Sequence, residues 1–129
     1  MHEATIAQSI LNIVTDRLKS VGVDACALSV EIVLGEFRNV DPESLSFAFD
    51  SMKDLCPATS NCRLDINVIN ASALCSENAH NYRPVAELAY RCPACDGGIA
   101  KMVHGEELDV VNLIIEVANE EKKHARIAG

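Results

Sequence analysis

The spacing of cysteines and histidines between residues 75 and 98 constrains this chain more than any other feature. Cys92 and Cys95 are separated by Pro-Ala and followed by Asp-Gly-Gly. Two thiolates at this spacing can hold one tetrahedral metal ion while the small residues let the chain fold back, as in half of a zinc ribbon. The other half is irregular. Three positions after Cys75 stands Asn78, which is not a zinc ligand.

A histidine supplies the fourth donor in our interpretation. His80 follows Cys75 by five positions and is the nearest side chain of a type that zinc accepts. We therefore predict a Cys3His zinc site formed by Cys75, His80, Cys92 and Cys95. His104 is a rival fourth ligand, although it lies beyond the turn and is more simply a surface residue.

Two other readings of the cysteines compete with a metal site. A Cys-x-x-Cys pair also serves as a redox dithiol, but that motif stands between a strand and a helix, and a glycine turn follows Cys95. A disulfide framework requires export, and the sequence opens without a secretory signal. We therefore expect a reducing, cytoplasmic location. Small buried hydrophobes are expected at the three remaining cysteines, Cys26, Cys56 and Cys62.

Composition narrows the class of protein. The chain has 129 residues, of which 49% are hydrophobic but only 4% aromatic, so the core should be aliphatic. No apolar run approaches the ~18–20 residues that cross a bilayer, so we expect no membrane segment. A net charge of −8 argues against nucleic acid as a partner. Protein partners or cations fit better.

Hydrophobic periodicity divides the chain into helices and strands. Apolar positions at helical spacing predict helices over 4–20 and 41–55, and Asp41-Pro42 has the composition of a helix start. Alternating apolar positions predict strands over 28–34, 63–69 and 107–117.

This order predicts an α+β fold. Two helices pack on one face of a three-stranded sheet, and a zinc-ribbon-like insert precedes the last strand. We expect an α/β domain made of residues 1–70 and 105–118, a zinc-binding insert over 71–104 and a polar tail over 119–129.

The first residues, Met1-His2-Glu3, form a candidate site of another kind. A histidine at position two brings three nitrogens within reach of one ion: the α-amine, the histidine's own amide and its imidazole. Nickel(II) and copper(II) favour such nitrogen-rich, square-planar geometry. A solvated terminal histidine is the simpler alternative.

Further motifs follow in order: a Leu-Gly-Glu-Phe loop, Phe-Ala-Phe after Asp41, the late Arg-Cys-Pro-Ala-Cys pair and Gly-Glu-Glu-Leu before the last strand. Together with Met-His-Glu, they make residues 1–117 resemble the HypA/HybF family of hydrogenase-maturation nickel chaperones. The resemblance implies a nickel site with His2 and the backbone of Glu3, and a structural zinc in the insert. It also implies nickel delivery, with a HypB-type GTPase, to the large subunit of a [NiFe] hydrogenase; some members serve urease.

The resemblance does not assign a role to every candidate residue. Asp41 matches an acid that the family places beside the nickel site, while it could equally cap the second helix. Asn78 departs from the family pattern, which has a cysteine there, and His80 is our inference from zinc chemistry alone.

Two further functions stay open at this point. The first is a zinc-ribbon adaptor that docks a protein and carries no metal cargo. The second is an enzyme using the thiols of Cys92 and Cys95. No second catalytic constellation accompanies these thiols in the sequence, such as a Ser/His/Asp set or a phosphate loop, and we expect no enzyme activity.

Overall fold

The computed structural model describes residues 2–117 and 124–127, with side chains described through residue 117. Two α-helices and seven strands follow in the order α1 (His2–Val21), β1 (Ala25–Gly35), α2 (Pro42–Met52), β2 (Arg63–Ile69), β3 (Ser72–Cys75), β4 (Asn81–Tyr82), β5 (Ile99–His104), β6 (Leu108–Val117) and β7 (His124–Ile127). No helix in the described part of the chain is both long and apolar enough to span a bilayer.

The chain divides into two compact units. Unit 1 is formed by Met1–Ile32, Val40–Asn67 and Asp109–Gly129. Unit 2 is formed by Val33–Asn39 and Val68–Leu108. The short segment at the end of β1 therefore belongs with the cysteine-rich segment, although about thirty residues separate them in the sequence.

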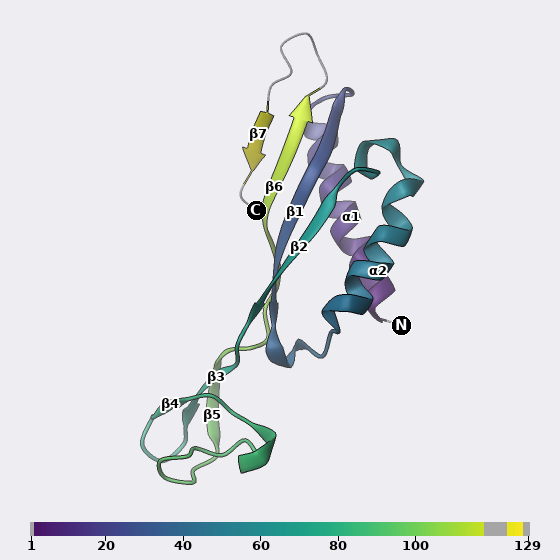
Figure 1. Cartoon of the computed structure of the whole chain (residues 1–129). Coiled ribbons are helices and arrows are strands. Elements are labelled where there is room, and N and C mark those ends of the chain that lie inside the picture. The colour runs from purple at the N-terminus through teal and green to yellow at the C-terminus, as the bar shows by residue number, and fades with distance from the viewer. Residues whose placement is uncertain (1, 118–123, 128–129) are drawn as a thin grey trace. The chain divides into compact units, whose positions relative to one another are not determined.

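One sheet has the strand order β2-β1-β6-β7, and both helices lie on the same face of it (Figure 1). The predicted α+β fold, with two helices on one face, is therefore confirmed. The sheet has a strand more than expected, because β7 pairs antiparallel with β6, from Leu113↔Ile127 to Glu116↔His124. We expected residues 119–129 to be a polar tail. Residues 119–123 and 128–129 of this tail lie outside the described residues.

The core of unit 1 lies between the helices and the sheet. Helical spacing buries one side of α1, and α2 contributes Leu45 and Phe49, both fully buried. Facing strand residues are aliphatic, among them Ile32 and Ile115. Each such side chain contributes ~1.5–3 kcal/mol by leaving water. The expected helical stripe does not extend to Leu55, which is 83% exposed in a short 3-10 turn after α2.

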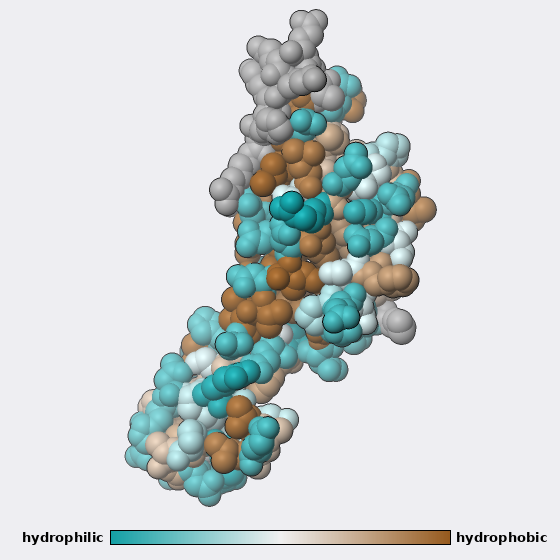
Figure 2. Space-filling model, in the orientation of Figure 1, coloured by the Kyte–Doolittle hydropathy of each residue, from teal (hydrophilic) through white to brown (hydrophobic). Residues whose placement is uncertain are grey.

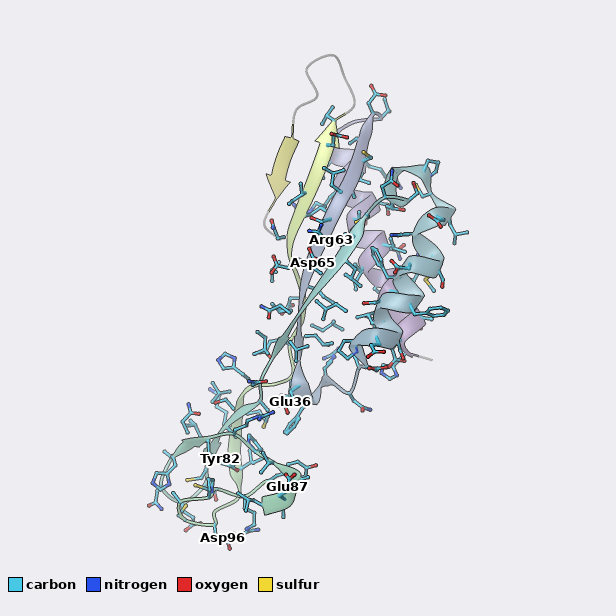
Figure 3. The ribbon with its side chains drawn as sticks, in the orientation of Figure 1. Glu36, Arg63, Asp65, Tyr82, Glu87 and Asp96 are labelled. Atoms are coloured by element: carbon cyan, nitrogen blue, oxygen red, sulfur yellow. The ribbon has the colours of Figure 1, made fainter. Side chains whose placement is uncertain are left out.

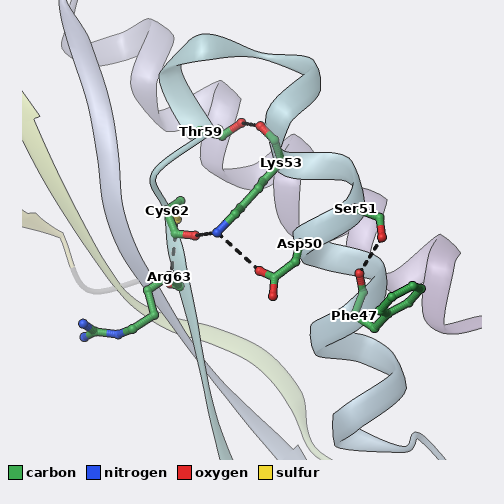
Figure 4. A network of polar contacts seen from close by, with 7 residues as sticks. All are labelled: Phe47, Asp50, Ser51, Lys53, Thr59, Cys62 and Arg63. Carbon is green, nitrogen blue, oxygen red and sulfur yellow. Dashed lines mark hydrogen bonds and ion pairs between the residues drawn. The ribbon is translucent and has the colours of Figure 1, made fainter.

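Polar contacts tie the end of α2 to the start of β2 (Figure 4). The buried Thr59 hydroxyl donates to the carbonyl of Lys53 at 2.7 Å. The Lys53 ammonium donates to the carbonyl of Cys62 at 3.2 Å and pairs with Asp50 at 3.3 Å. The first of these bonds satisfies a carbonyl group that the end of α2 leaves without an intrahelical partner.

The visible surface of unit 1 differs in polarity between the strands and α2. In Figure 2, hydrophobic residues gather over the strands, whereas the surface of α2 is mostly hydrophilic. Charged residues interrupt the exposed part of the sheet. On β2, the Arg63 guanidinium holds Asp65 through bonds of 2.9 and 3.0 Å (Figure 3).

Unit 2 has a three-stranded sheet of order β4-β3-β5, with both pairings antiparallel. Its buried cluster is small and contains two of its own cysteines: the members are Ala73, Cys75, Tyr82 and Cys92. The Tyr82 hydroxyl donates to the carbonyl of Tyr90 at 2.8 Å. A core of this size supplies little hydrophobic stabilisation, which is the usual setting for a structural metal.

Residues 33–39 join unit 2 by close backbone contact. A Cβ atom on Gly35 would overlap the backbone of Gly105, so only glycine fits there. Gly105 itself has φ +127°, which L side chains rarely adopt. Glu36 accepts from the amide of Ala71 at 2.8 Å and from Arg83 at 2.7 Å.

Candidate metal centres

The first metal centre is built from two turns of the same shape. In the first turn, the amide of Cys75 donates to the carbonyl of His80 at 3.0 Å, and the amide of Ala79 donates back to the carbonyl of Cys75 at 3.2 Å. Ala79 has φ 55°, the left-handed conformation that reverses the chain. The turn directs the sulfur inward while its backbone bonds are satisfied.

The second turn repeats this pattern after Cys92. The amide of Cys92 donates to the carbonyl of Gly97 at 2.9 Å, and the amide of Asp96 donates to the carbonyl of Cys92 at 2.7 Å. Asp96 has φ 60° at the position equivalent to that of the first turn's left-handed residue. The irregular first half predicted from sequence is therefore regular in its backbone.

The equivalence of the turns explains why a histidine replaces a cysteine as the expected fourth ligand. Asn78 occupies the position that Cys95 holds in the second turn. Its side chain donates a hydrogen bond to Cys95 and its amide donates to Cys75 Sγ at 3.3 Å. His80 stands where the second turn has Gly97. The first turn thus offers a donor two positions later than the second, on a longer side chain.

The four donor atoms of Cys75, His80, Cys92 and Cys95 all lie within 4.8 Å of one another. Nδ1 of His80 is 3.6 Å from the sulfurs of Cys75 and Cys92, and the sulfurs of Cys75 and Cys95 are 3.7 Å apart. With Zn–S near ~2.3 Å and Zn–N near ~2.0–2.1 Å, a tetrahedron has S–S edges of about 3.8 Å and S–N edges of about 3.6 Å. The geometry of these donors fits zinc.

Hydrogen bonds prepare one thiolate before any metal binds. Desolvation opposes charge on Cys75, yet the amides of Asn78 and His80 donate to its sulfur and lower its pKa to about 6. At Cys95, the amide of Gly97 and the Asn78 side chain favour the thiolate, but burial and the neighbouring thiols outweigh them and raise its pKa. Metal binding at neutral pH would then displace a proton from the Cys95 thiol.

The other candidate donors lie elsewhere. His104 belongs to no group of metal donors among the described residues. Its Nδ1 pairs with Glu107 Oε2 at 2.9 Å. Cys62 is buried, and burial raises its pKa to about 11, as suits an inert thiol. Cys26 and Cys56, which we also expected to be buried, are half-buried.

The second candidate centre lies at the start of α1 in unit 1. His2 Nε2 is 3.4 Å from Glu3 Oε2, and the same carboxylate oxygen accepts from the backbone amide of Asp41 at 3.4 Å. Three of the predicted nickel residues therefore come together across 38 positions of sequence. Met1, the fourth, lies outside the described residues.

Asp41 has the capping role that we considered beside a metal role. Its carboxylate accepts from the Ser44 hydroxyl at 2.7 Å and from the Ser44 amide at 3.3 Å, at the N-terminus of α2. The Ser44 hydroxyl is the main cause of a lowered Asp41 pKa. The carboxylate is therefore charged at neutral pH.

From the sequence, only the backbone of Glu3 was assigned to the nickel site. The contacts of its side chain with His2 and Asp41 were not predicted. That side chain is 15% exposed and lies between His2 and Asp41. An acid in the first turn of a helix was visible in the sequence, but nothing in its spacing indicated a partner so distant along the chain.

A mixed α+β unit and a Cys3His donor group in one small chain define a metal-binding protein. The chain matches the family described as "Hydrogenase/urease nickel incorporation, metallochaperone, hypA" over residues 1–115. It is 34% identical to the hydrogenase maturation factor HypA of Chlorobium limicola, over 90% of this chain and 97% of that protein. It is 26% identical to that of Methanopyrus kandleri, over 94% and 97%.

Solved structures share the fold. The solution structure of the nickel metallochaperone HypA from Helicobacter pylori has a TM-score of 0.58 at 18% identity, covering 86% of this chain and 94% of that one. A second HypA solution structure reaches 0.64 at 20% identity, covering 88% and 94%. The chain belongs to the HypA family of nickel metallochaperones for hydrogenase maturation. The resemblance drawn from the sequence is confirmed.

The paired turns lead to a testable prediction about the fourth ligand. Replacing His80 with alanine should weaken zinc binding at least about a hundredfold, because even outer hydrogen-bond partners are worth ~10–100-fold. Because Asn78 stands at the cysteine position of the turn, adding Asn78→Cys to His80→Ala should restore tight binding. Competition with a chelator measures both, and His104→Ala is the matched control. Loss of zinc from the control variant alone would show that the fourth ligand is misassigned.

Proposed function

We propose that this chain binds Ni(II) at its N-terminus and delivers it for the maturation of a [NiFe] hydrogenase. The proposed donors are the amine of Met1, the imidazole of His2, backbone nitrogen at His2 and Glu3, and the carboxylate of Asp41. The observation that carries the proposal is the convergence of His2 and Asp41 on Glu3 in unit 1, where the Glu3 carboxylate contacts the imidazole of His2 and the backbone amide of Asp41.

A partly exposed site suits a cargo metal. The His2 side chain is 55% exposed, so an incoming protein could reach an ion held there. The nitrogen-rich donor set favours nickel over zinc, which prefers a closed tetrahedron. Family membership supports the same cargo.

Zinc has a structural role in this proposal. Cys75, His80, Cys92 and Cys95 would hold it, and the fit of their donor atoms to a tetrahedron supports this. Zinc bound there would stabilise unit 2, whose buried cluster is small. A HypB-type GTPase and the hydrogenase large subunit are the proposed partners, urease is a second proposed recipient, and the cytoplasm is the proposed location.

One substitution separates the two roles of Asp41. Asparagine caps helices about as well as aspartate, so Asp41→Asn should leave the unfolding free energy of unit 1 nearly unchanged. It removes the charge, and nickel affinity should fall about tenfold or more. Calorimetric titration of nickel into untagged protein, with thermal unfolding of the same samples, measures both. Unchanged nickel affinity would leave Asp41 as a cap only. Complete lack of nickel binding by the unmodified chain would overturn the proposed function.

A further inference from the structure

A groove of about 530 Å³ lies beside the proposed nickel donors, within unit 1. One wall is the N-terminal turn of α1, and the other is a helical stripe of α2. Its lining residues are Glu3, Ala4, Asp41, Glu43, Ser44, Phe47, Ala48, Ser51 and Met52. Nothing in the proposed nickel site requires its apolar half.

Phe47 dominates that apolar half. Its side chain is 76% exposed, although Phe49 two positions later is fully buried. Figure 4 shows the Phe47 ring projecting from α2 on the side away from Arg63 and β2. An aromatic ring kept in water at the wall of a groove loses the ~1.5–3 kcal/mol that burial would give, and such rings are typical anchors of protein interfaces.

The charged part of the groove is acidic. Its three charged residues among those described are Glu3, Asp41 and Glu43, and they cluster at the end where both helices begin. Glu43 and Phe47 are four positions apart on α2, which places them on one face, about 6 Å from each other along the axis. The groove therefore presents an apolar surface and a negative end one helical turn apart.

We propose that this groove docks a segment of a partner protein that carries an apolar anchor and a lysine or arginine one helical turn from it. The anchor packs on Phe47 and Met52, and the cation pairs with Glu43. The proposal rests on the proposed function, because a segment docked here lies against Glu3 and Asp41, where the nickel would be taken up or handed over.

Charge favours a different protein over a second copy of this chain. Each chain has a net charge of −8, so two copies repel at long range, whereas a basic segment is attracted to the acidic end. Complementary charge also sets which way along the groove the segment runs.

The test uses the full chain and three synthetic helical peptides rich in alanine and glutamine. The first carries two leucines one turn apart, followed one turn later by a lysine. The second replaces the lysine with glutamate, and the third replaces both leucines with alanine. Titrations followed by amide chemical shifts should give saturable changes at residues 41–52 with the first peptide. The second and third should bind about tenfold more weakly.

Variants assign the contacts. Phe47→Ser should weaken the first peptide about tenfold, whereas Leu55→Ser, at a more exposed apolar site outside the groove, should not. Glu43→Gln should reduce the preference for lysine over glutamate, because Glu3 and Asp41 remain at that end, and Glu43→Lys should reduce it further. A lysine preference that is unchanged in both Glu43 variants would overturn the proposal.

Two other results would also overturn it. Equal effects of Phe47→Ser and Leu55→Ser would make the binding nonspecific. Sedimentation showing a dimer that Phe47→Ser dissociates would assign the groove to a second copy of this chain. Failure of the proposed function is distinguishable, because Phe47 is no proposed metal donor: its serine variant should bind nickel normally while losing the peptide.

Discussion

A variant with both Cys92 and Cys95 replaced by alanine is expected to lose its zinc and to unfold unit 2 while unit 1 stays folded. The buried cluster of unit 2 has four members, and two of them, Cys75 and Cys92, are themselves proposed ligands. Structural zinc contributes apparent binding free energies of ~10–16 kcal/mol in small zinc-finger peptides. A cluster of this size cannot replace a term of that magnitude.

The helices should survive because their core does not use the metal. Leu45, Phe49 and Ile115 are fully buried in unit 1. Metal analysis should show loss of about one zinc per chain. Amide spectra should show collapsed dispersion for residues 75–98, with helical circular dichroism retained.

The matched control removes the same number of thiols elsewhere, as Cys26→Ala with Cys56→Ala. Both residues are half-buried and belong to no donor group among the described residues. This variant should keep its zinc and its spectrum. One zinc per chain retained by the Cys92/Cys95 double variant would contradict the assignment of the metal centre.

An extension of two residues before Met1 is expected to abolish specific nickel binding, and His2→Ala should do the same. The extension turns the amine into an amide and moves His2 away from the second position, so that the fused chelate rings cannot form. Zinc content and folding should not change, because the first residue of α1 that is buried in the core is Ala7. The control is a two-residue extension at the C-terminus, which should bind nickel as the native chain does.

The pH dependence of nickel binding follows from the same donors. An unperturbed α-amine titrates near ~7.7–8.0 and an imidazole near ~6.5, and both must be neutral to bind metal. Affinity should therefore fall as pH decreases from about 8 to 6. Asp41 should not add to this fall, since its lowered pKa, caused first by the Ser44 hydroxyl, keeps it charged throughout.

Calorimetry at several pH values checks both expectations. If the N-terminally extended chain binds nickel as tightly as the native chain, the terminal-amine site is wrong.

Local pattern was sufficient for much of the fold. Helical spacing predicted α1 and α2, and alternation predicted β1, β2 and β6, because these signals depend on neighbours within a few residues. The Cys92–Cys95 pair indicated its turn for the same reason. The motif at Met1–Glu3 indicated a metal site because its donors are adjacent in the chain.

Long-range contact decided the rest. The turns at Cys75 and Cys92 have equivalent backbones, so Asn78 stands at the position where the second turn has a cysteine. No hydrophobic periodicity in the sequence indicates this equivalence. Likewise, β7 lies in the segment that we expected to be a polar tail, and it is a strand through its pairing with β6. Glu36 meets Ala71 and Arg83 across 35 and 47 positions.

The proposed nickel residues show the same division. The sequence by itself determined that His2 and Glu3 are neighbours and that Asp41 begins a helix. Only the tertiary structure brought the Glu3 carboxylate to the amide of Asp41, 38 positions away. Side-chain chemistry and local periodicity depend on residues that are close together in the sequence. A contact between distant residues forms only once the packed core has fixed the path of the chain between them.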